Sequence, residues 1–176
     1  MTGTDPAAPA FVAGYGPQPS DFNGLIQAPL TFLTTKVLFR AQRNAAQSLT
    51  SGINNLIAFD TILEDPYGGW SSGTNTWTCP AGCSGWFEIS MTAWMNSAGS
   101  NTAVIAAVAA LNGVIQQNMT SEWAVNGHAT GTSGMLPVSL YGGQDTVGGY
   151  IFTTASVNPP TAAGQRPGIE ICWISL

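Results

Sequence analysis

Residues 67–88, with the sequence YGGWSSGTNTWTCPAGCSGWFE, most constrain what this chain can fold into. Aromatic and β-branched residues favour strands, whereas Pro and Gly favour turns. Here Trp77 and Trp86 lie on either side of a turn-forming segment, Cys-Pro-Ala-Gly-Cys-Ser-Gly. The segment therefore predicts a β-hairpin in which residues 74–79 pair with residues 86–94. It contains no evident catalytic group.

Short strand-forming runs recur along most of the chain. Asn112-Gly113 separates two apolar runs, an arrangement typical of a hairpin because both turn residues take positive φ. The alanine-rich run before this turn also fits a helix, but its length of about ten residues and the turn favour a strand. Further strands are predicted at residues 35–41, 56–63, 102–111, 114–117, 134–141, 146–156 and 169–176. This pattern predicts an all-β fold, an antiparallel jelly-roll sandwich.

The chain is unusually poor in charge. Charged residues make up 7% of the sequence, against about 25% in an average soluble domain. With four basic residues and a net charge of −5, the chain has no basic patch for a run of phosphates, so we expect no nucleic-acid partner. A surface built from Gly, Ser, Thr, Asn and Gln is typical of a protein held in a large, stable assembly.

The first 34 residues differ from the rest. Five prolines within them exclude helix interiors and central strands, yet bulky apolar residues are interspersed among the prolines. We interpret residues 1–34 as an extended arm that docks onto another protein, and residues 35–176 as the globular domain; a disordered tail is the alternative. The proposed anchors are Phe11, Tyr15, Phe22, Leu25 and Ile26.

Catalytic and metal sites are not evident in the sequence. The single histidine, His128, lies among turn-forming residues without a neighbouring carboxylate, and no serine is marked as a nucleophile by the strand-to-helix elbow that such an enzyme needs. Cys79 and Cys83 lack the further ligands of a zinc site, and buried, inert thiols are the simpler interpretation. We therefore expect no enzyme activity, no metal and no cofactor. The longest apolar run is too short to span a bilayer, and the N-terminus has no features of a secretory signal.

The domain resembles the globular heads of complement components and the relatives of tumour necrosis factor. The resemblance is carried by residues 37–41, 57–60, 69–70, 76–80 and 85–89, by Asn112-Gly113, and by the closing run 169–174. It implies a trimeric jelly roll. Some members of the family hold calcium in acidic clusters, and this sequence has no recognisable cluster of that kind. This difference agrees with our expectation that the chain has no metal site.

The tryptophans then allow two interpretations. Either they fill the core and the three-fold interface, or some form a platform on which sugar rings stack. We favour packing for Trp77, Trp86, Phe87, Trp94 and Trp173. Trp123 and His128, beside a glycine-rich stretch, are the candidates for contact with a surface ligand.

The arm together with the start of the domain also resembles small virion proteins of tailed phages that infect actinobacteria, usually described as minor tail proteins. This resemblance is carried by residues 19–22, 29–33 and 37–41. It implies a homotrimeric structural protein, made in the host cytoplasm, that reaches the virion and docks through its arm onto another virion protein. A capsid decoration protein on the head is one alternative. A host-attachment module that binds cell-surface carbohydrate is another, and an enzyme that depends on His128 is the least favoured.

Overall fold

The computed structural model describes residues 37–96, 103–123, 130–156 and 165–175. In these residues the chain forms eleven strands and no helix. The strands are β1 (Val37–Gln42), β2 (Asn54–Leu56), β3 (Thr61–Glu64), β4 (Trp70–Ser71), β5 (Thr76–Thr78), β6 (Gly85–Met95), β7 (Val104–Leu111), β8 (Val114–Trp123), β9 (Thr130–Leu140), β10 (Thr146–Thr153) and β11 (Gly168–Ser175).

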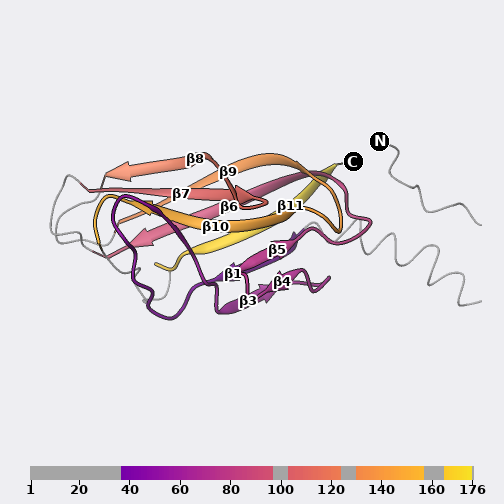
Figure 1. Ribbon diagram of the computed structural model, residues 1–176, viewed down its shortest axis with the longest axis horizontal. Coiled ribbons are helices and arrows are strands. Elements are labelled where there is room, and N and C mark those ends of the chain that lie inside the picture. Colours follow the sequence, from indigo (N-terminus) through magenta and orange to yellow (C-terminus); the bar gives the residue numbers. More distant parts are fainter. Residues whose placement is uncertain (1–36, 97–102, 124–129, 157–164, 176) are drawn as a thin grey trace, which may run out of the picture.

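Two antiparallel sheets make up the domain. The five-stranded sheet has the order β3-β1-β11-β6-β9, and the six-stranded sheet the order β4-β5-β10-β7-β8, with β2 also paired to β10. Figure 1 shows the long strands β6 to β11 aligned along the molecule, with the short strands β3, β4 and β5 on the side away from β8. The predicted all-β jelly-roll sandwich is confirmed.

The core lies between the sheets and is rich in aromatic rings. Along β6 alternate side chains are buried, which is the pattern of a strand with one face on the core. Phe39 stacks on Trp70 and on Trp77 at ring-centroid distances of 5.2 and 6.2 Å, and Trp77 meets Phe87 edge-on at 6.5 Å. These rings, drawn from four strands, fix how the two sheets pack at this end of the sandwich.

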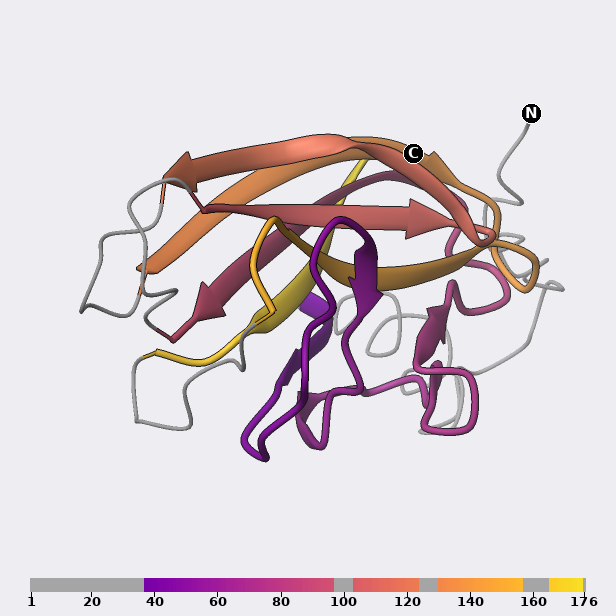
Figure 2. The ribbon, with the colours of Figure 1, turned by 60° about the vertical axis from the view of Figure 1, so that its left-hand side comes forward.

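The β7–β8 hairpin forms as predicted. Leu111 pairs with Val114 across the turn, where Asn112 and Gly113 have φ values of 52° and 77°. The alanine-rich run is strand β7, and residues 105–110 are buried because β7 lies inside the six-stranded sheet, between β10 and β8. In Figure 2 this long hairpin arches over one side of the molecule, opposite the loops between β3 and β5. The strand predicted at the C-terminus is also present, as β11.

The predicted pairing of residues 74–79 with residues 86–94 is wrong. Strand β5 pairs with β4 and β10 in the six-stranded sheet, whereas β6 pairs with β11 and β9 in the other sheet. The turn between them, in which the amide of Cys83 donates to the carbonyl of Pro80 at 3.0 Å, carries the chain from one sheet to the other. Turn-forming residues mark where a strand ends but not the sheet that the next strand joins.

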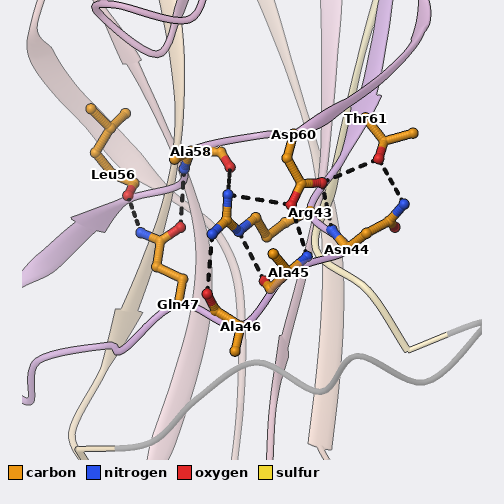
Figure 3. Close-up of polar contacts among 9 residues, drawn as sticks. All are labelled: Arg43, Asn44, Ala45, Ala46, Gln47, Leu56, Ala58, Asp60 and Thr61. Atoms are coloured by element: carbon orange, nitrogen blue, oxygen red, sulfur yellow. Dashed lines mark hydrogen bonds and ion pairs between the residues drawn. The ribbon is translucent and has the colours of Figure 1, made fainter.

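The prediction of a single strand at residues 56–63 is also wrong, because the chain leaves the ladder between β2 and β3. There the side chain of Arg43 donates to the carbonyl of Ala58 at 2.6 Å and forms an ion pair with Asp60 at 3.4 Å (Figure 3). The Asp60 carboxylate in turn accepts hydrogen bonds from the amides of Asn44 and Ala45, both at 2.8 Å. Side chains thus satisfy backbone groups that a strand would have paired.

The stretch between the strands predicted at residues 114–117 and 134–141 is strand wherever the structure describes it. Strand β8 continues to Trp123 and β9 begins at Thr130. Gly134 lies within β9, where a Cβ atom would come within 2.7 Å of the Cβ of Met119 on β8. A glycine-rich sequence indicated a loop, but here it allows two strands from different sheets to approach closely.

Candidate functional site: the outer face of the five-stranded sheet

The outer face of the five-stranded sheet is where exposed aromatic and polar side chains gather. Because side chains alternate along a strand, every second residue of β6, from Trp86 through Ser90 to Trp94, points away from the core. The register places Met135 and Glu170 beside Ser90, and Gly168 beside Thr92. Residues from β1, β11, β6 and β9 therefore form one continuous surface.

One half of this surface is apolar. Trp86 and Met135 are 50% and 63% exposed, although side chains of this kind are usually buried in monomeric proteins. Pro137 lies between them on β9, paired with Glu88, and Ile174 is 52% exposed near Trp86 at the end of β11. An exposed cluster of large apolar side chains is typical of a surface that another macromolecule covers.

The other half of the surface is polar and contains a hollow of about 340 Å³. Its walls include the side chains of Gln42, Thr92 and Trp94, and Gly168 lies at its centre in the row from Gln42 to Thr92. Gly168 contributes no side chain to the outer face, so the surface is lower there than on either side. The hollow therefore depends on a glycine flanked by larger residues on both neighbouring strands.

Trp94 separates this hollow from a second one of about 320 Å³, which is lined by Thr92, Gly131 and Thr132 among others. The indole of Trp94 lies over the backbone of β9: a Cβ atom at Gly131 would lie 2.4 to 2.5 Å from three of its ring carbons. The indole of Trp94 thus packs directly against the backbone of Gly131. Because any larger residue would displace the ring, its orientation is fixed by the backbone beneath it.

Charges at the first hollow are balanced. Arg40 forms an ion pair with Glu64 at 2.9 Å and lies opposite Glu170 in the sheet register. Arg166 and Glu170 also line the hollow. Toward the apolar half, the thiol of Cys172 donates to the Glu170 carboxylate at 3.2 Å, and burial, followed by that hydrogen bond, raises the pKa of Cys172 to about 12. The thiol therefore stays neutral at pH 7.

The residues assigned to packing fall into two groups. Trp77 and Phe87 are fully buried, and Trp173 is half-buried against the core. Trp86 and Trp94, by contrast, lie on the outer face of the five-stranded sheet.

Of the two residues predicted to contact a surface ligand, the structure describes one. Trp123, at the end of the edge strand β8, is 64% exposed and lines neither hollow. His128 and the five proposed anchors of the arm lie outside the described residues.

The described residues offer little chemistry beyond binding. Within them, no group of three or more His, Cys, Asp and Glu side chains comes together to hold a metal ion. Cys79 and Cys83 are buried free thiols, and burial is the main cause that raises the pKa of Cys79, to about 12. Nor does the described part of the chain contain a helix with the length and apolarity needed to cross a bilayer.

Sequence reasoning missed the residues of the hollow. Gln42, Thr92 and Gly168 are ordinary strand residues in three separate segments, and nothing in their local sequence distinguishes them. The one available indication was Gly168, which begins a strand-forming run and leaves a gap on one face of the sheet.

Comparison with known proteins identifies the architecture. No protein-family model matches the chain, and no curated protein sequence matches it significantly. Among solved structures, it is similar to the globular domain of zebrafish complement 1qA, with a TM-score of 0.52 and 14% identity over 79% of this chain and 97% of that one. It is also similar to murine APRIL, with a TM-score of 0.54 and 7% identity over 78% of this chain and 99% of that one. The chain therefore has the jelly-roll fold shared by the complement C1q heads and the tumour necrosis factor relatives.

Proposed function

We propose that this chain is a non-enzymatic structural protein that assembles as a homotrimer through the apolar half of its five-stranded sheet. The observation that carries the proposal is the exposure of Trp86 and Met135 on a regular sheet face. A second copy of the chain is the partner that suits such a face best. The resemblance to the complement and tumour necrosis factor domains implies that a fold of this kind forms trimers. Closed symmetry then buries the same apolar residues in every copy.

Most of the charged side chains on this face lie toward its polar half. The ion pair between Arg40 and Glu64, and the carboxylate of Glu170, lie toward the polar half of the face. Glu88 pairs with Pro137 between Trp86 and Met135, and Glu170 shares the register row of Met135 through Ser90. A contact centred on Trp86 and Met135 therefore covers Glu88, so the carboxylate of Glu88 needs a hydrogen-bond or ion-pair partner in the neighbouring copy.

The assembly that holds the trimer is a phage virion in our proposal, with residues 1–34 as the arm that docks onto another virion protein. The proposal rests on the resemblance of the arm and of residues 37–41 to minor tail proteins, together with the low charge of the chain. A position on the tail follows from that resemblance. A decoration protein on the head is the alternative, and immunogold labelling of intact particles distinguishes the two locations.

The trimer interface is tested by replacing Trp86 with glutamate. Because this side chain is half exposed in one chain, the change spares the core but places an unpaired charge in the proposed contact. Size-exclusion chromatography with light scattering should give three times the 18.2 kDa chain mass for the original protein and a single chain for Trp86→Glu. Ile53→Glu, at a residue 51% exposed in a loop, is the matched control and should stay trimeric. A monomeric original protein, or a trimeric Trp86→Glu variant, contradicts the proposal.

A further inference from the structure

We propose that the hollow beside Trp94 is a binding site for a neutral pyranose sugar, a role that the trimer does not require. The site is built from Gln42 on β1, Gly168 on β11, and Thr92 and Trp94 on β6. It lies toward the other end of the face from Trp86, since Trp86 and Trp94 are near opposite ends of β6. The two surfaces adjoin at Ser90, which lines the hollow and pairs with Met135, so ligand binding and assembly are measured separately in the test.

The size and floor of the site suit one ring. A hollow of about 340 Å³ lies at the lower end of the range for small-molecule sites, roughly 300 to 1,000 Å³. Its floor is the backbone around Gly168, where a Cβ atom would lie 3.4 Å from the carbonyl oxygen of Ala41. That distance is an ordinary contact, so a larger side chain is compatible with the backbone there. The absence of a side chain at this position leaves room for a ligand.

The aromatic wall is oriented in advance. The indole of Trp94 is fixed against Gly131 on the neighbouring strand, so little side-chain entropy is lost when a ligand packs against it. A pyranose has an apolar face of C–H groups, and an indole is the side chain with the largest flat surface to meet it. Trp86 has no glycine beside it in the sheet register, where its partners are Ser139 and Ser175.

The polar walls match a polyol. Gln42 supplies an amide with both donor and acceptor groups, and the hydroxyls of Ser90 and Thr92 can donate or accept. Arg40 and Glu170 lie next to each other on the same wall. Neighbouring donors and acceptors of this kind can bind adjacent ring hydroxyls in pairs, as sugars require.

The balance of charge determines which sugars fit. Two arginines and two glutamates, Arg40, Arg166, Glu64 and Glu170, lie at or next to the hollow. A phosphate or an acidic sugar would meet both carboxylates in a chain with a net charge of −5, and a cationic ligand would meet both guanidinium groups. A neutral sugar avoids both repulsions.

The test is titration of the full-length protein with maltotriose, lactose and chitotriose, followed by saturation-transfer NMR. We expect at least one of the three to bind saturably with a dissociation constant of about 1 mM, a common strength for a small, shallow site. Gly168→Val fills the hollow and should weaken that binding at least tenfold. Thr92→Val removes one hydroxyl without changing the shape of the side chain, and should weaken it by about threefold to tenfold.

Trp123→Ala is the control, because Trp123 is exposed but lines neither hollow. It should leave the affinity unchanged. If Gly168→Val does not fold by circular dichroism, Gly168→Ala adds a single methyl group to the same place and serves instead. The proposal is overturned if none of the three sugars binds at about 10 mM, if the filled variant binds as well as the original, or if Trp123→Ala alone abolishes binding.

Light scattering on each sample separates this proposal from that of the trimer. A monomeric protein that binds sugar supports the proposed sugar site and contradicts the proposed trimer. A trimeric protein that binds none of the sugars supports the proposed trimer and contradicts the proposed sugar site.

Discussion

At the scale of single residues, Asp60 shows how a few charges stabilise a charge-poor chain. Its carboxylate accepts hydrogen bonds from two consecutive amides, those of Asn44 and Ala45, and forms an ion pair with Arg43. Partial burial by itself would raise the pKa of Asp60, but these hydrogen bonds and the charge of Arg43 outweigh it and hold the pKa below its ordinary value of 3.8. The ionised carboxylate therefore stabilises the segment between β1 and β3.

We expect Asp60→Asn to lower the free energy of unfolding by about 1 kcal/mol at pH 7, since an amide retains only one acceptor and loses the ion pair in a partly exposed setting. The carboxylate has a lower pKa when folded, so its contribution is present above the unfolded pKa of about 3.9 and is lost as the pH falls through the folded value. Urea denaturation at several pH values should show the two proteins converging below about pH 4.

Glu122→Gln, on the exposed end of β8, is the control for removing a carboxylate, and should leave the free energy of unfolding at pH 7 unchanged. Equal stability of Asp60→Asn and the original protein at pH 7 would contradict the role given to Asp60. So would a difference that persists at pH 2 to 3.

At the scale of the elements, the β7–β8 hairpin is fastened to the turn between β9 and β10. The side-chain amide of Asn112 donates to the Asp145 carboxylate at 2.7 Å, and its oxygen accepts from the amide of Thr146 at 2.8 Å. Asp145 also accepts from the amide of Tyr141 at 2.7 Å. One asparagine thus serves both the backbone geometry of its own turn and the connection to a neighbouring turn.

Asn112→Gly separates these two roles, because glycine adopts a positive φ freely but lacks the side-chain amide. We expect a loss of about 1 to 2 kcal/mol in the free energy of unfolding, for two hydrogen bonds of which one involves a charged partner. Asn75→Gly, at another asparagine with positive φ, is the control and should cost less. Urea denaturation measures both, and a cost for Asn112→Gly no larger than for Asn75→Gly would refute the bridging role.

The elements also show which predictions local sequence supports. The β7–β8 hairpin was predictable because Asn112 and Gly113 define the turn between strands that are adjacent in sequence. The interruption after β2 was not, because it depends on Arg43 reaching the carbonyl of Ala58. The partner of β5 was not predictable either, since both sheets of a sandwich offer an apolar inner face to a strand with one apolar side.

At the scale of the whole molecule, the N-terminal arm and the globular domain have separate roles in our proposal. The described strands form a core rich in aromatic rings between the two sheets. Residues 1–34 are, in our proposal, the part that attaches the trimer to the particle. Attachment and folding should therefore be separable.

We expect deletion of residues 1–33 to leave the trimer intact by light scattering but to abolish incorporation into phage particles, because the apolar anchors are lost while the sheets are not. Immunoblotting of purified particles, made in cells that express only the shortened chain, measures incorporation. Full incorporation of the shortened chain would refute the docking role of the arm. Loss of the trimer would show instead that the arm contributes to the domain.

The sequence by itself determined the all-β class, the β7–β8 turn and the presence of strands such as β1, β7 and β11, because these follow from residue type, alternation and positive φ within a few neighbouring positions. The tertiary structure decided which sheet each strand joined and which tryptophans were buried. It also decided that Gln42, Gly168 and Trp94 meet around one hollow. Those outcomes depend on pairing between segments far apart in the chain. The free energy of that pairing comes from contacts throughout the sandwich, so no single residue or local pattern predicts it.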